Sequence, residues 1–440
     1  NNNPVGLNSN TGWWDGFLVT SGGNIDASWA TISRGRTIFD IAGSATLANV
    51  TVDYSFIGAD VGGVASITEL SCAHADFTCI SVLQGGSVSA SSVSVSDSAY
   101  GIENGGSISL DGFEVSNSGY PIAIYDGSTG SGQNLNFDNV SAAIMSRGVS
   151  SFTFNSMQVD DSGLLLDAIG SDGLVISNLS GEGIDSLIIG TNMADVTIDN
   201  WAVNGSGASG WAFAIDTTGS FTLENSEFNG FNKGFRLIGS GIHTINNSVM
   251  SFSGPMFDVS GNGRLHTLST TLSTTAEFGH LSGVDSFWSG DNLNGGSASD
   301  GLELVSGKHV FDSTTYARNY LYADSTSFGL GVTWATVEAD GLILSGWSDG
   351  IQCRIDCLVS GTSLTTNLGG VASGSGINID GGSVILDTLI TGNSFNGIHL
   401  EEGDLHIGDW TGSGHGGVTL LVDVDSTATV RNFPAYSSNG

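Results

Sequence analysis

The chain has few basic residues, few prolines and few cysteines, and it lacks a long uninterrupted hydrophobic run. Ten Lys and Arg stand against 44 Asp and Glu, giving a net charge of −34. Nucleic acids and anionic membrane surfaces are bound through clusters of Lys and Arg, so we expect neither as a partner. No apolar stretch is long enough to span a bilayer, so we expect no membrane insertion.

Cysteine is scarce, and all of it occurs in two tight local pairs, Cys72 with Cys79 and Cys353 with Cys357. Short spacing with no thiol left over favours two disulfides and therefore an oxidising compartment. A metal site is the alternative, because His74 lies inside the first pair. The two pairs are too far apart in the repeats described below to share one ion, so disulfides are the prediction.

What is abundant is glycine, with 66 residues, and much of it belongs to a repeat. Residues 106–124 and 219–237 are two clear copies, in which short apolar–polar–apolar segments alternate with Gly, Ser and Asn. Most copies begin 20 to 24 residues after the previous one, and one spacing is stretched to 29. The opening positions are Gly43, Gly63, Gly86, Gly106, Gly127, Gly148, Gly170, Gly190, Gly219, Gly239, Gly261, Gly283, Gly307, Gly361, Gly382, Gly403 and Ser426.

A period of this length, built from alternating strand segments and turns, predicts a β-solenoid. Leucine-rich repeats need helix-forming residues after the strand, and propeller blades need about twice the period. We therefore predict an all-β fold, a parallel β-helix of about 18 coils, forming one domain over residues 1–440. The period does not fix the hand of the coil. Residues 308–375 keep strands but lose clean register, which indicates irregular coils with a lateral loop.

Small polar residues recur at one corner of the repeat and predict a stacked column. Such residues tolerate turn conformations, and stacked Asn amides can hydrogen-bond from coil to coil. Trp201 and Trp410 follow this column at apolar positions, so we expect both in the core. The column comprises Asn49, Ser92, Gly112, Asn139, Ser156, Asn178, Asn200, Asn225, Asn247, Thr270, Thr388 and Asp409.

Over about residues 20–430 this repeat resembles the pectin-lyase-like β-helix superfamily, in its secreted or cell-surface form. The resemblance implies the right-handed coil, and it admits polysaccharide hydrolases, lyases and non-enzymatic proteins. Polygalacturonase-like hydrolases carry paired aspartates with a Gly-His-Gly, but here Gly414-His415-Gly416 stands alone. Pectate-lyase-like enzymes need Arg or Lys beside a calcium-binding Asp cluster, whereas the arginines here are scattered. Lyase activity on a polyanion is therefore disfavoured.

Two acidic pairs are the remaining catalytic candidates, Asp160 with Asp161 and Glu401 with Glu402, with His399 or His415 near the second. A generic hydrolase needs two carboxylates facing one site, and adjacent residues on a strand point to opposite faces. Both pairs can equally be surface acids. We expect no cofactor. The acidic surface could recruit Ca²⁺, but the calcium-binding Gly-Gly-x-Gly-x-Asp repeat is absent.

Asn-x-Ser/Thr sequons provide candidate glycosylation sites. Asn204 lies in the stretched repeat beside Gly205 and is the favoured site, whereas side chains in the corner column are expected to be occupied by stacking. The full set is Asn49, Asn139, Asn178, Asn204 and Asn246.

Taken together, these features predict an extracellular or cell-surface structural protein that forms part of a layer, filament or adhesin. The first residues, Asn1 to Pro4, follow no Met, so we expect a removed leader or an internal piece of a longer protein. Uncapped coils would be covered by a second copy or by neighbouring segments of a longer chain. The alternative is a polysaccharide-active enzyme or a glycan-binding spike that uses a lateral groove.

Overall fold

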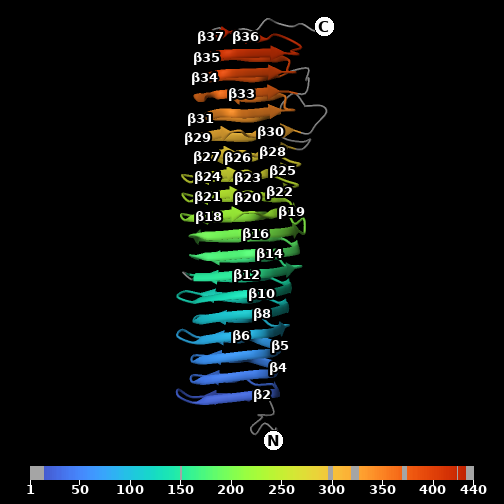
Figure 1. Cartoon of the computed structure of the whole chain (residues 1–440), viewed down its shortest axis with the longest axis vertical. Coiled ribbons are helices and arrows are strands. Elements are labelled where there is room, and N and C mark those ends of the chain that lie inside the picture. The colour runs from blue at the N-terminus through green and yellow to red at the C-terminus, as the bar shows by residue number, and fades with distance from the viewer. Residues whose placement is uncertain are drawn as a thin grey trace. The chain divides into compact units, whose positions relative to one another are not determined.

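The computed structural model describes residues 14–148, 151–295, 301–318, 327–368, 374–423 and 425–432. Within these ranges the chain is an all-β parallel β-solenoid of about 18 coils without a helix, as the repeat predicts (Figure 1). The right hand of the coil stays a prediction. None of the described segments forms a helix long and apolar enough to cross a membrane.

The chain divides into two compact units, one ending at Ala208 and the other beginning at Ser209. The strands of the first unit are β1 Phe17–Val19, β2 Asn24–Ser33, β3 Thr37–Ile41, β4 Ser44–Val61, β5 Val64–Val82, β6 Ser87–Ser96, β7 Tyr100–Asn104, β8 Ser107–Ser118, β9 Tyr120–Tyr125, β10 Thr129–Val140, β11 Ala142–Arg147, β12 Ser151–Asp160, β13 Leu164–Ile169, β14 Leu174–Ile184, β15 Ser186–Met193 and β16 Val196–Gly205.

The second unit continues the same pattern. Its strands are β17 Trp211–Thr217, β18 Ser220–Glu224, β19 Glu227–Phe231, β20 Lys233–Gly239, β21 Ile242–Asn246, β22 Val249–Phe252, β23 Phe257–Gly261, β24 Arg264–Leu268, β25 Thr271–Thr274, β26 Gly279–Ser282, β27 Asp285–Ser289, β28 Asn292–Gly295, β29 Leu302–Asp312, β30 Thr315–Arg318, β31 Phe328–Ser345, β32 Asp349–Cys353, β33 Cys357–Asn367, β34 Ser375–Gly392, β35 Asn396–Ser413, β36 Leu420–Val422 and β37 Ser426–Asn432.

Each coil contributes three strand segments, and equivalent segments of successive coils pair in parallel. β4, for example, carries a first segment at 44–48, a second at 50–53 and a third at 57–61, and all three pair with β5. We call the stacked first, second and third segments the first, second and third faces. Successive strands stack side by side in Figure 1.

The core consists of apolar rows that run from coil to coil. On the third face of the first unit, Ile102, Ile122, Ile144, Leu166 and Ile188 lie in register and are 0% exposed. Burying each such side chain stabilises the fold by about 1.5–3 kcal/mol. Trp201 and Trp410 are 1% and 2% exposed, which confirms that both belong to the core.

Two columns of left-handed residues, not one, turn the chain between faces in the first unit. The first column contains Asn178 and Asn200, and the second contains Asn117 and Asn139, each with φ near +50°. Amide ladders connect coils in both: Asn200 Nδ2 donates to Asn178 Oδ1 at 2.6 Å, and Asn139 Nδ2 donates to Asn117 Oδ1 at 2.7 Å. The expectation that Asn139 stands in the first column is therefore wrong. Asn134 occupies that position, with φ of 54°.

The irregular stretch predicted at 308–375 contains a register shift. β31 pairs with β33, but the pairing slips between Glu338 and Asp340 and again between Asp340 and Leu342. Residues 319–326 and 369–373, which fall within the stretch predicted to carry a lateral loop, lie outside the described residues.

Candidate functional site

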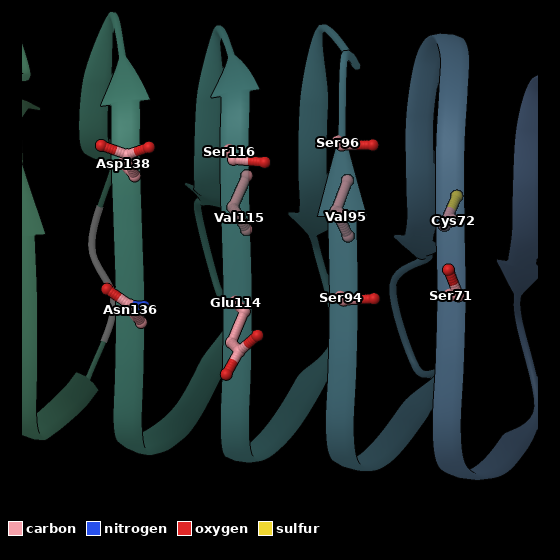
Figure 2. A pocket seen from close by; sticks show the side chains of 10 residues that line it. All are labelled: Ser71, Cys72, Ser94, Val95, Ser96, Glu114, Val115, Ser116, Asn136 and Asp138. Atoms are coloured by element: carbon pink, nitrogen blue, oxygen red, sulfur yellow. The ribbon is translucent and has the colours of Figure 1, made fainter.

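A shallow hollow of about 390 Å³ lies on the second face of the first unit (Figure 2). Ser71 on β5, Ser94 and Ser96 on β6 and Ser116 on β8 give it short side chains. Hydroxyl groups and the backbone make its floor, and carboxylates border it. Its lining is Ser71, Cys72, Ser94, Val95, Ser96, Glu114, Val115, Ser116, Asn136 and Asp138.

Glu114 and Asp138 are the carboxylates of this hollow. Glu114 pairs with Asn136 across β8 and β10, and Asp138 is two residues beyond Asn136, so the two acids are diagonal neighbours about 7–8 Å apart at the Cα. Carboxylates at such a separation, beside hydroxyl groups, can accept hydrogen bonds from a polyhydroxylated ligand. Both acids are solvent-exposed, as surface acids would be.

Asp160, a candidate from the sequence, is in register with Asp138 one coil further along. Its carboxylate accepts hydrogen bonds from Gln158 Nε2 at 2.7 Å and from the Glu182 backbone N–H at 3.1 Å. Asp161 stands in the second corner column with φ of 48°. The two neighbours therefore occupy a strand face and a corner, and the structure does not bring them together as a pair.

Glu401 and Glu402 are both exposed at the end of a third-face segment. His399 lies between acids, with Nδ1 3.3 Å from Glu401 Oε1 and Nε2 3.3 Å from Asp423 Oδ2. His415 belongs to a different network. Its ring nitrogens are 3.1 Å from Thr391 Oγ1 and 2.9 Å from Ser394 Oγ, and burial lowers its pKa. The Gly-His-Gly motif thus positions a histidine that ties neighbouring coils together.

A second cluster, on the third face of the first unit, was not predicted from the sequence. Tyr125 Oη donates a hydrogen bond of 2.9 Å to Glu103 Oε1. Burial raises the pKa of Glu103, the Tyr125 hydrogen bond opposes the shift, and the charge of Asp60 adds to it. Burial beside Glu103 also raises the pKa of Tyr125. A half-buried carboxyl that holds its proton more tightly than usual is the property of a general acid.

Asp60 stands two coils before Glu103 in the same outward row, with Ser81 between them. Two coil rises separate their Cα atoms by about 10 Å, close to the carboxyl separation of 6.5–9.5 Å that inverting glycoside hydrolases use. Asp60 Oδ1 is buried and has no hydrogen-bond partner among the described residues. Ser81, which stands between the two acids in this row, has a short side chain.

Aromatic rings flank this cluster. Tyr100 and Tyr120 stack with centroids 5.4 Å apart, and Phe77 meets Tyr100 edge to face at 5.5 Å. Aligning the third segments on their inward residues Ala59, Ile80 and Ile102 would have placed Asp60, Ser81 and Glu103 in one outward row. The pairing of Glu103 with Tyr125 depends on the contact between coils, which the alignment alone does not give.

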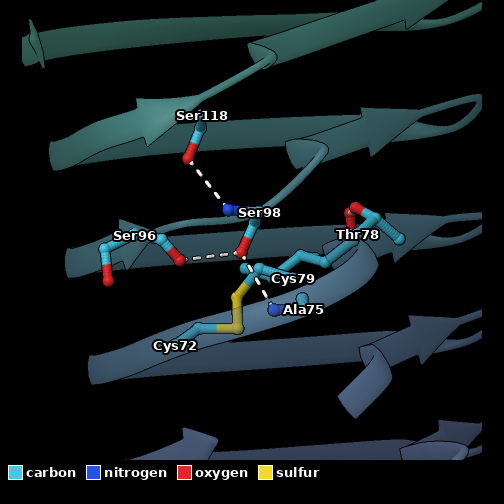
Figure 3. Close-up of a disulfide and its surroundings, with 8 residues drawn as sticks. Cys72, Ala75, Thr78, Cys79, Ser96, Ser98 and Ser118 are labelled. Carbon is cyan, nitrogen blue, oxygen red and sulfur yellow. Dashed lines mark hydrogen bonds between the residues drawn. A yellow bond between two sulfur atoms is a disulfide. The ribbon is translucent and has the colours of Figure 1, made fainter. Parts of the chain in front are cut away.

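Both cysteine pairs are disulfides, as predicted, with Cα–Cα distances of 6.1 Å for Cys72–Cys79 and 5.7 Å for Cys353–Cys357. The first closes a bend within β5 (Figure 3). Serines support the same corner, because Ser98 Oγ accepts from the Ala75 N–H at 3.2 Å and Ser118 Oγ accepts from the Ser98 N–H at 3.2 Å. No group of three or more His, Cys, Asp or Glu in the described ranges is arranged to hold a metal ion.

The sequons differ in how accessible their amides are. Asn139 and Asn178 donate their Nδ2 groups to amide ladders, and Asn49 has the left-handed φ of the first column. Asn246 is half-buried, whereas Asn204 is exposed at the end of β16. Glycosylation stays a prediction, and Asn204 is the site that it favours.

Four tryptophans, Trp201, Trp288, Trp347 and Trp410, are at most 2% exposed and belong to the core. Trp29 and Trp334 are 82% and 57% exposed, each with a left-handed φ at a corner. Trp13 lies outside the described residues.

No protein-family model matches the chain, and no curated protein shows detectable sequence similarity to it.

Proposed function

We propose that this chain is an extracellular structural solenoid that builds a surface layer, filament or adhesin by stacking its coils onto further coils. Repeated coils that each contact only their neighbours suit this role, because the same interaction that joins two coils can join two molecules. The paired disulfides suit an oxidising environment outside the cell.

The main support for the proposal is that the inward side of β2, the first long strand described, is only partly covered. Its inward side chains Ile25, Ala27, Ala30 and Ile32 are only half-buried. Their counterparts one coil further on, Ala45, Leu47, Val50 and Val52, are at most 5% exposed. Apolar residues and backbone groups at such an edge gain stability when another β-coil covers them.

Two variants test coil stacking by electron microscopy and by light scattering across a concentration series. Ile25→Lys with Ile32→Lys places inward charges on the edge strand and should leave single molecules where the native protein forms strings. Ser28→Lys, outward on the same strand, is the matched control and should assemble normally. A native protein that stays monomeric with both edges free would refute the structural role. If flanking segments of a longer chain cover the edge, strings should appear only when those segments are removed.

A second function, action on a polysaccharide, is supported by the Asp60–Glu103 pair. Glu103 would protonate the leaving oxygen, and Asp60 would activate water on the opposite side of the sugar ring. The resemblance to pectin-lyase-like proteins adds support. A screen for new reducing ends with neutral and acidic polysaccharides should show activity that Glu103→Gln lowers by about 10²–10⁴-fold. Asp138→Asn is the control in the hollow, and an equal loss there would place the reaction elsewhere.

A further inference from the structure

The second face of the second unit carries two outward rows that we call the neutral ledge. The rows lie on the outer side of a strip whose inward side chains, such as Met250, Leu272 and Leu344, are 0% exposed. Register is unbroken along both rows. The tall row is Val249, Thr271, Asn292, Thr315, Ile343, Thr365, Ile390 and Thr411, and the short row is Ser251, Ser273, Asn294, Ala317, Ser345, Asn367, Gly392 and Ser413.

Glu227 precedes Val249 in the tall row, and from Val249 onward neither row contains a charged residue, although the whole chain carries a net charge of −34. The other two faces of the unit differ. The third face presents Arg236, Asp258 and Glu303 in one outward row, and the first face presents Arg264 and Asp285. Two copies of so acidic a protein repel each other, and the neutral ledge is the face on which they can approach with the least like-charge contact.

The side chains of the ledge are also solvent-exposed, and large and small ones alternate along several of its strands. Val249, Ile343 and Ile390 are 50%, 41% and 43% exposed. Each is followed two residues later, on the same strand, by a small residue of the short row: Ser251, Ser345 and Gly392. The side chains of Val, Ile and Thr are stiff at χ1, so little conformational entropy is lost when they are covered.

The difference in side-chain size between the tall row and the short row fits a second copy of the ledge in one orientation. A two-fold axis parallel to the direction of coil stacking places the tall row of each copy over the short row of the other, so Ile390 meets the partner's Gly392. A two-fold axis along the strands would place tall on tall. We propose that the neutral ledge binds a second copy of this chain side by side and in parallel, which rests on the structural role proposed above.

The contact should be weak for one pair of molecules. Standard interfaces use about 20–30 residues a side, and the ledge offers fewer. Where copies are already joined end to end, each ledge contact becomes intramolecular in effect, and many weak contacts add up. The ledge would then bundle strings of copies that run in the same direction.

Sedimentation velocity in the Ile25→Lys, Ile32→Lys background tests the ledge separately from coil stacking, because that background blocks end-to-end contact only. Raised salt screens the overall repulsion, and dimers should form as concentration rises. Adding Ile343→Glu with Ile390→Glu should weaken dimerisation at least tenfold. Ile242→Glu with Ile385→Glu is the matched control, because Ile242 and Ile385 are 46% and 49% exposed on the first face. The control should dimerise normally.

Crosslinking tests the orientation. Val249→Cys alone should give covalent dimers with a short bismaleimide, because parallel packing brings the two copies of this position together. An antiparallel pair would crosslink only when Val249→Cys is mixed with Thr411→Cys, and that result would overturn the parallel arrangement. Monomers at every concentration and salt, or equal loss in the control, would overturn the ledge itself. If the native protein forms end-to-end strings but the ledge does not dimerise, the ledge proposal fails and the proposed coil stacking stands.

Discussion

Ser286 Oγ lies 2.8 Å from His309 Nδ1 in the core of the second unit. The pair resembles the nucleophile and base of a hydrolase, yet the two residues are 3% and 0% exposed. His309 Nε2 donates to the Ser306 carbonyl oxygen at 3.1 Å, and Trp288 Nε1 donates to Ser286 Oγ at 2.8 Å. The network is complete with a neutral imidazole and has no access for a substrate, so it stabilises the core.

The buried histidines predict acid sensitivity. Burial lowers the pKa of His309 to about 4, and that of His243, in the same inward row, to about 4. Above pH 6.5 the two histidines are mainly neutral in the folded and in the unfolded chain, so they change the free energy of unfolding little there. As pH falls below 6.5, only the unfolded chain takes up these protons, and folding weakens until about pH 4. The free energy of unfolding should lose about 2 kcal/mol per histidine between pH 7 and 5.

His243→Leu isolates the contribution of this histidine from that of the other titrating groups. The variant should be at least as stable as the native chain at pH 7, because His243 Nδ1 has no hydrogen-bond partner among the described residues. Its loss between pH 7 and 5, measured by urea unfolding, should be smaller by about 2 kcal/mol. Identical slopes for both proteins would show that His243 is not buried as described.

The amide ladder predicts a graded response at Asn178. This side chain donates to Asn155 Oδ1 at 2.6 Å and accepts from Asn200 Nδ2 at 2.6 Å, with φ of 54°. Asn178→Ala should lower the free energy of unfolding by about 2 kcal/mol, through lost hydrogen bonds and a strained left-handed backbone. Asn178→Gly keeps the backbone relaxed and should lose about 1 kcal/mol. Chemical denaturation compares the two, and equal losses would exclude backbone strain.

The disulfide at Cys72 predicts a modest, local stabilisation. It joins residues 7 apart, so it restricts a short loop in the unfolded chain. Replacing both cysteines by Ala should lower the free energy of unfolding by about 2 kcal/mol. Thermal unfolding with and without reductant measures the change, and Cys353→Ala with Cys357→Ala provides the comparison. A reductant effect that persists when all four cysteines are replaced would point to another cause.

Glycosylation, if the native source performs it, should be found at Asn204 before any other sequon. The intact mass should fall by one glycan in Asn204→Gln, whereas Asn139→Gln should leave the mass of attached sugar unchanged because its Nδ2 is held by Asn117. Peptide mapping that finds glycan on Asn139 would show that the ladder opens in solution.

The repeat in the sequence was enough to predict the solenoid and the burial of Trp201 and Trp410, because both depend on a period that every coil shares. It misplaced Asn139, since two corners with the same residue preference lie only a few residues apart in each coil. It missed Glu103 and the neutral ledge for a different reason. Their character depends on which outward residues become neighbours on successive coils, and no single repeat contains that information.

The parallel register has a consequence for how such a chain can change. Within a unit, each coil meets the next through the same three faces and the same corners, so a whole coil can be duplicated or deleted with only its own two borders remade. Each such event would alter length by about 4.8 Å and leave distant sites intact. Duplication of the gene segment for one coil can therefore lengthen the solenoid in fixed steps, without changing the side chains on the outer faces of the other coils.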